Sequence, residues 1–98
     1  MASKQSESIK TLYTSWINAM VEKPDMELDE IRGLFEHWGD ITAEPEEVDY
    51  LEVEANGVRA MWAIPKDCAQ DRVALCTHGG GYVTGSMYTH RKLFGHIA

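Results

Sequence analysis

Apolar side chains in the first part of the chain recur about every three to four residues, which is the spacing of one face of an α-helix. The first such stretch covers about residues 7–22, with apolar side chains at Ile9, Leu12, Tyr13, Trp16, Ile17 and Met20. We expect this helix to end at Lys23, because a residue that precedes proline is pushed out of the α region. A second stretch, over about residues 26–37, keeps the same spacing to Trp38, and Gly39 is expected to stop it.

Further along, apolar and polar residues alternate, as they do in half-buried β-strands. This alternation covers residues 48–54 and 58–64, and Asn56 and Gly57 between them favour a two-residue hairpin turn. A third run, residues 72–77, is apolar on both faces at its centre, which is typical of a strand covered by helices on both sides. Helices, hairpin, strand and a further helical stretch in this order predict an α/β fold.

Three successive glycines, Gly79, Gly80 and Gly81, follow the third predicted strand and are preceded by His78. Glycine permits positive φ and a close approach of the backbone, so such a run can aim its N–H groups at an anion. Backbone donors of this kind stabilise the oxyanion of acyl transfer, where losing one costs about 3 kcal/mol. The alternative is that the turn cradles a phosphate or only closes a loop.

The stretch His78-Gly79-Gly80-Gly81-Tyr82, followed by a helix from about residue 89, resembles the hormone-sensitive lipase family of α/β-hydrolases. The HGGG-type motif of lipases and esterases supplies oxyanion-hole N–H groups. The resemblance implies the N-terminal portion of an α/β-hydrolase fold, with cap helices in residues 1–43. Residues 44–98 would be the start of the catalytic domain, with the hairpin, the third strand, the oxyanion loop and the start of the next helix. That fold places another strand between residues 58–64 and 72–77, so we expect no direct pairing between them.

The resemblance also implies a role for each residue of the motif. Gly80 and Gly81 would supply the N–H donors, while Gly79 would allow the tight turn. His78 would support the loop through hydrogen bonds to nearby backbone, or would only end the strand. Tyr82 would form a wall of the substrate pocket, or would simply pack. The large side chains of the first two helices either pack together or line the acyl entrance: Trp16, Met20, Phe35 and Trp38.

A Gly-x-Ser-x-Gly sequence, with which α/β-hydrolases present the nucleophilic serine, does not occur in the chain. The resemblance therefore implies a carboxylic-ester hydrolase that uses a serine nucleophile, with no member of the catalytic triad among these 98 residues. The 98 residues alone are then expected to be inactive. The expected partners are a small-molecule ester and the remainder of the hydrolase fold. The alternative is a non-catalytic small-molecule-binding protein with the same fold.

The net charge of −7 is unevenly distributed. Residues 1–54 contain four basic and fourteen acidic side chains, whereas residues 55–98 contain five basic and two acidic ones. An acidic first half argues against nucleic acid or an anionic membrane surface as a partner. The acidic run at residues 44–49 is interpreted as a solvated linker.

Membrane insertion and metal binding are not indicated by the sequence. The chain has no apolar stretch close to the ~20 residues of a membrane-spanning helix, and no apolar signal-peptide core follows Met1. We therefore predict a cytoplasmic protein without a membrane span. Cys68 and Cys76 lack the spacing of metal ligands, so we expect reduced thiols and no metal site. No cofactor is indicated.

Overall fold

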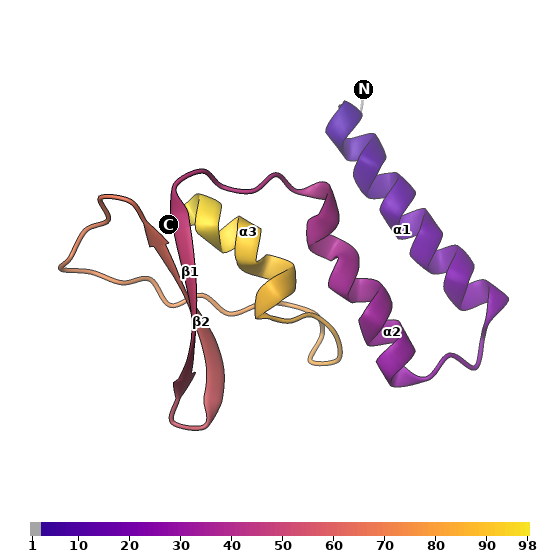
Figure 1. The fold of residues 1–98 in the computed structure, drawn as a ribbon. Coiled ribbons are helices and arrows are strands. Elements are labelled where there is room, and N and C mark those ends of the chain that lie inside the picture. The colour runs from indigo at the N-terminus through magenta and orange to yellow at the C-terminus, as the bar shows by residue number, and fades with distance from the viewer. Residues whose placement is uncertain (1–2) are drawn as a thin grey trace.

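The computed structural model describes residues 3–98. The elements in chain order are the helices α1 (Lys4–Glu22) and α2 (Leu28–Phe35), the 3₁₀ helix η1 (Glu36–Ile41), the strands β1 (Val48–Ala55) and β2 (Val58–Pro65), and the helix α3 (Met87–Ile97). The helices α1 and α2 lie side by side, and α3 lies between them and the hairpin of β1 and β2 (Figure 1). The helix α3 therefore connects the helices on one side of the molecule with the hairpin on the other.

The helices occur where the apolar spacing predicts them, but their ends depend on capping. The hydroxyl of Ser3 accepts from the N–H of Ser6 at 3.2 Å, so α1 begins three residues before the predicted start. The prediction that Gly39 stops the second helix is wrong, because the chain continues through it as η1. This tighter turn brings Gly39 against α3, where a Cβ atom would lie 3.4 Å from the carbonyl oxygen of Thr89. Among residues 3–98, no helix has the length and apolar character needed to cross a bilayer.

Trp16 is the centre of the packing between the helices, with 4% of its surface exposed. Its ring stacks on Phe35 at a centroid distance of 4.6 Å and lies 5.7 Å from Trp38. Tyr13 meets it edge to face at 5.3 Å. Because these rings contact one another, the packing interpretation of the aromatic residues is favoured over a pocket lining.

The hairpin of β1 and β2 confirms the prediction from the alternating residues. Ala55 pairs with Val58, so the turn consists of two residues, and both have positive φ, 52° at Asn56 and 85° at Gly57. These are the signs of φ that a type I′ turn requires. On the hairpin face toward α3, the hydroxyl of Tyr88 donates to Glu52 at 2.7 Å.

The prediction of a third strand at residues 72–77 is wrong for the described chain, since within residues 3–98 the segment forms no ladder with another strand. A strand is stabilised by hydrogen bonds to neighbours, and the two-stranded sheet leaves this segment without one. Its apolar side chains are exposed, Val73 by 71% and Leu75 by 94%. Because the segment is not a strand here, the expected strand order, with another strand between it and β2, stays a prediction.

The described residues do not close a core of their own. Their radius of gyration is 16.0 Å, whereas a compact domain of about 100 residues has a radius of gyration of about 13 Å. Among the large apolar side chains of residues 3–98, that of Trp16 alone is buried. The open arrangement leaves one face of the hairpin uncovered, with Trp62 exposed by 47% and Leu51, its partner in the ladder, by 54%.

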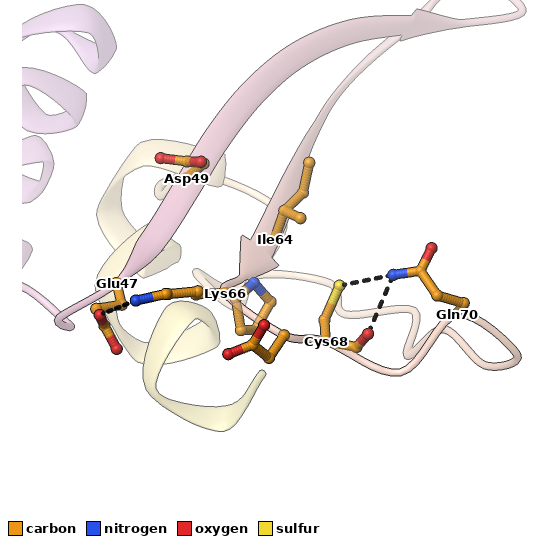
Figure 2. Close-up of a pocket in the computed structure, with 8 residues that line it drawn as sticks. Glu47, Asp49, Ile64, Lys66, Cys68 and Gln70 are labelled. Atoms are coloured by element: carbon orange, nitrogen blue, oxygen red, sulfur yellow. Dashed lines mark hydrogen bonds and ion pairs between the residues drawn. The ribbon is translucent and has the colours of Figure 1, made fainter.

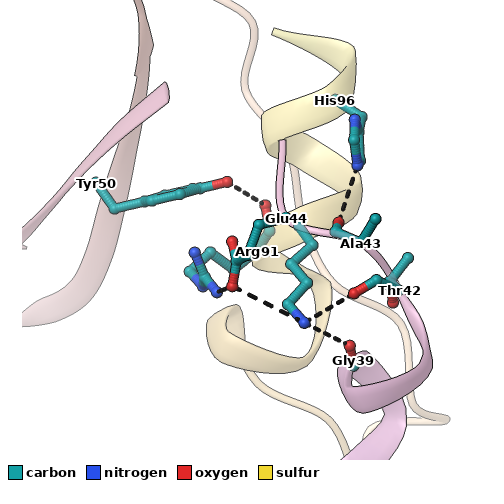
Figure 3. Close-up of polar contacts among 8 residues, drawn as sticks. Gly39, Thr42, Ala43, Glu44, Tyr50, Arg91 and His96 are labelled. Atoms are coloured by element: carbon teal, nitrogen blue, oxygen red, sulfur yellow. Dashed lines mark hydrogen bonds and ion pairs between the residues drawn. The ribbon is translucent and has the colours of Figure 1, made fainter. Parts of the chain in front are cut away.

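The acidic run at residues 44–49 keeps its carboxylates exposed, which agrees with the interpretation as a solvated linker, and two of them form ion pairs with the rest of the chain. Arg91 donates to the carboxylate of Glu44, and Lys66 pairs with Glu47 at 2.9 Å. The hydrogen bond from Arg91 lowers the pKa of the Glu44 carboxyl below its usual value. The basic residues of α3 also bind the backbone before this run, as Figure 3 shows for His96 and the carbonyl of Ala43.

Candidate functional site

The glycine segment, residues 78–86, leads from the extended stretch into α3 (Figure 1). Four of its residues have positive φ: Gly80 at 137°, Gly81 at 62°, Tyr82 at 61° and Gly85 at 84°. This conformation costs little at glycine but is uncommon at other residues. The run of left-handed residues therefore explains why the sequence places glycine at three of these positions.

A tight turn closes the segment on the carbonyl oxygen of Gly80. This oxygen accepts from the N–H of Val83 at 3.1 Å, from the N–H of Thr84 at 3.0 Å and from the hydroxyl of Thr84 at 3.2 Å. Among the residues that the structure describes, the N–H groups of Gly79, Gly80 and Gly81 form no hydrogen bond. The turn thus uses the carbonyl of Gly80 internally and leaves consecutive N–H donors available for an acceptor such as an oxyanion.

At two glycines of the segment, the neighbouring backbone is too close to leave room for a side chain. A Cβ atom at Gly80 would lie 1.8 Å from the carbonyl oxygen of Thr84, and one at Gly85 would lie 2.5 Å from that of Gly79. No atom lies within 4 Å of a Cβ built at Gly79 or at Gly81, so Gly81 is constrained by its φ alone. Gly85 was not predicted as a site residue, and its position directly before the serine that caps α3 is the only local signal for it.

His78 lies at the start of the segment and faces α3. Its Nδ1 is 2.9 Å from the carbonyl oxygen of Gly79, and its ring centroid is 5.9 Å from that of His90. The ring of His90 also lies near Trp38, at 6.2 Å, and near Phe94, at 5.7 Å. His78 therefore connects the glycines to the aromatic side chains between η1 and α3.

Tyr82 follows the glycines with its side chain fully exposed. Since it is not glycine, its φ of 61° is an uncommon backbone conformation, of the kind that clusters at functional sites. The ring is free of packing against the rest of residues 3–98, and it projects from the same turn as the free N–H groups of Gly80 and Gly81.

Ser86 has a structural role at the start of α3. Its hydroxyl oxygen accepts from the N–H groups of Tyr88 and Thr89, at 3.1 and 3.2 Å, and the hydroxyl donates to Glu36 at 3.0 Å. The hydroxyl of Thr89 accepts in return from the N–H of Ser86, which completes a capping box. These bonds leave Ser86 as a helix cap.

A shallow cavity of about 560 Å³ lies at the far end of the hairpin, where Glu47, Asp49, Lys66 and Cys68 line it (Figure 2). Its lining comes from the start of β1, the end of β2 and the loop after β2, whereas the glycine segment adjoins the N-terminal end of α3. Within residues 3–98, no group of three metal-ligating side chains is close enough to hold an ion. The cavity therefore contributes no residue to the candidate site at the glycine segment.

Burial lowers the pKa of the His90 imidazole below its usual value, and the nearby His78 lowers it further. We therefore expect His90 in a full-length protein to titrate below about 6.5, the usual value for histidine. The unfolded chain then binds a proton at higher pH than the native one, so stability should fall as the pH drops from about 6.5 toward the pKa of folded His90.

NMR titration of the His90 ring protons, assigned with His90→Gln, measures this pKa. The same substitution should flatten the dependence of the unfolding free energy on pH in that window. A midpoint at or above the usual histidine value would contradict the expected direction.

Comparison of the chain with protein-family models and with curated proteins found no match. Among solved structures, it is similar to an esterase from the bacterial hormone-sensitive lipase family, with 33% sequence identity and a TM-score of 0.73 over 100% of this chain and 32% of that one. It is also similar to a double mutant of the esterase E40, with 32% identity and a TM-score of 0.72 over 99% of this chain and 32% of the other. The chain thus spans about a third of the length of these two esterases.

Proposed function

Since this chain belongs to the hormone-sensitive lipase family, we propose that the protein containing it hydrolyses carboxylic esters with the glycine segment as its oxyanion hole. The observation that carries the proposal is the pair of free N–H groups at Gly80 and Gly81. They belong to consecutive residues with positive φ, in a turn that hydrogen bonds to the Gly80 carbonyl keep closed. Such a turn is preorganised before substrate binds, which is the condition for stabilising charge as it develops.

In the proposed reaction, a serine from sequence outside these 98 residues attacks the ester carbonyl carbon, and a histidine takes the serine proton. The carbonyl π electrons move to oxygen, and Gly80 and Gly81 donate to the resulting anion. Collapse of this intermediate breaks the bond to the alcohol, which leaves with the proton from histidine. Water then hydrolyses the acyl-enzyme through a second oxyanion, which the same donors stabilise.

The remaining parts of the chain have supporting roles in this proposal. Residues 1–43 form part of a cap over the site, and residues 44–98 begin the catalytic domain. Gly79 allows the chain to enter the turn, and His78 supports it through the Gly79 carbonyl. Tyr82, exposed beside the donors, forms a wall of the pocket for a small ester. The uncovered hairpin face and residues 72–77 bind the remainder of the hydrolase fold. The proposed location of the protein is the cytoplasm.

Labelling with a serine-directed fluorophosphonate tests the proposed chemistry. We expect the full-length protein to be labelled at one serine, with loss of esterase activity in proportion. The isolated 98-residue chain, which contains no nucleophile elbow, should stay unlabelled and inactive. A full-length protein that binds esters without labelling or turnover would instead be a binding protein on the same fold, and the proposal would be wrong.

A further inference from the structure

The helices α2 and η1 contact the glycine segment at two points, from residues about 50 positions away in the sequence. The Nε of Arg32, in the last turn of α2, donates to the carbonyl oxygen of Val83 at 2.9 Å. The carboxylate of Glu36, the first residue of η1, accepts from the hydroxyl of Ser86 at 3.0 Å. The two contacts lie on either side of Gly85.

Val83 is the residue through which Arg32 reaches the turn. Its N–H donates to the carbonyl oxygen of Gly80, while its own carbonyl oxygen accepts from Arg32. A rotation of the turn would move the Val83 carbonyl away from Arg32, so this bond fixes the direction of the whole turn. Arg32 thus contacts the turn without contacting the N–H groups of Gly80 and Gly81.

Arg32 connects the turn to a packed part of residues 3–98, which the segment before the turn does not do. Residues 72–77 are exposed and form no ladder within the described part of the chain. Arg32, by contrast, lies three residues before Phe35, whose ring stacks on the buried Trp16. Arg32 is therefore attached to the best-packed region of residues 3–98.

The contact depends on a donor at one position of the side chain. Arg32 uses Nε for Val83, while its Nη1 lies 3.4 Å from the carboxylate of Asp29, which is almost fully exposed. An exposed ion pair of this kind contributes little. A neutral donor in the place of Nε should thus preserve the function of Arg32.

We propose that Arg32 is a positioning residue for ester hydrolysis, which holds the Val83 carbonyl and so aims the N–H groups of Gly80 and Gly81. This inference rests on the proposed function of the glycine segment. It couples the cap to the oxyanion hole, since movement of α2 would shift the donors directly. Glu36 has a lesser part, because it fixes the hydroxyl that caps α3.

Two substitutions of Arg32 separate the donor from the charge. Gln places its amide nitrogen at the same distance along the side chain as Nε, whereas Met has a similar length and no donor. In the full-length protein, we expect Arg32→Met to lower kcat about tenfold, because small misplacements of catalytic groups have large effects, with a smaller change in KM. Arg32→Gln should retain most of kcat. Lys23→Met removes a positive charge from the helical region of residues 1–43, at a side chain that is as exposed as that of Arg32 but does not contact the glycine segment. This variant should leave kcat unchanged.

Hydrogen exchange of the Val83 and Thr84 amides gives a second readout that does not depend on catalysis. Arg32→Met should speed their exchange, and Arg32→Gln and Lys23→Met should not. Equal losses of kcat in the Gln and Met variants, or wild-type kcat and exchange in Arg32→Met, would overturn the inference. Gly80→Val serves as the reference: if it keeps its kcat, the oxyanion hole itself is wrong, while faster exchange in Arg32→Met would still support the contact with Val83.

Discussion

Gly80→Val is expected to lower kcat of the full-length protein on a short acyl ester by about 10²-fold or more, with a smaller change in KM. The added Cβ would lie 1.8 Å from the carbonyl oxygen of Thr84, and the φ of 137° is unsuited to any other residue than glycine. The turn must therefore open, and the Gly80 N–H leaves the place where charge develops. Steady-state kinetics with a p-nitrophenyl ester measure both constants.

Gly81 provides the matched comparison, because its constraint is φ alone. Valine at position 81 should also lower kcat strongly, whereas asparagine, which tolerates left-handed backbone, should retain much more of it. Gly33→Val changes a glycine in open space on α2 and controls for an added side chain. Circular dichroism must show that each variant is folded. Near wild-type kcat in Gly80→Val and Gly81→Val together would contradict the oxyanion role.

Trp16→Ala is expected to reduce the free energy of unfolding by about 3–5 kcal/mol, the usual loss when a buried aromatic ring is removed. Trp16 is 4% exposed and contacts Phe35, Tyr13 and Trp38, so its removal leaves a cavity in the centre of the helices. Denaturant unfolding of the full-length protein measures the loss. Ile17→Ala, at the neighbouring position with 56% exposure, should have a much smaller effect. Equal losses in the two variants would show that Trp16 is not central to the packing.

Local signals in the sequence were sufficient for the elements that form from local interactions. Asn56 and Gly57 set the hairpin, since the turn type depends on these two residues alone. The helices follow from apolar spacing, while their ends depend on individual caps such as Ser3 and Ser86. A strand, however, is stabilised by partners elsewhere in the chain. An apolar run such as residues 72–77 therefore predicts an extended segment but cannot show what it pairs with.

The glycine motif could be predicted from the sequence because three consecutive glycines after a histidine are a local and uncommon pattern. Gly85 could not, since its need for glycine comes from the approach of the Gly79 carbonyl, which depends on the path of the folded loop. The contact of Arg32 with Val83 spans 51 positions and follows no periodicity. The ion pairs of Glu44 and Glu47 also join residues far apart in the sequence, so the composition of the acidic run predicts its exposure but not its partners.

The affinity of a transition-state analogue tests the central claim most directly. The catalytic serine, on losing its proton to the histidine, adds to the carbonyl carbon of a trifluoromethyl ketone, and the negative oxygen of the resulting hemiketal lies where the ester oxyanion would form. In the full-length protein, its Ki should rise in Gly80→Val by the same factor as kcat/KM falls, because the same donors stabilise both species. A Ki equal to that of the wild type, in a folded variant with reduced kcat/KM, would contradict the assignment of the oxyanion hole to Gly80 and Gly81.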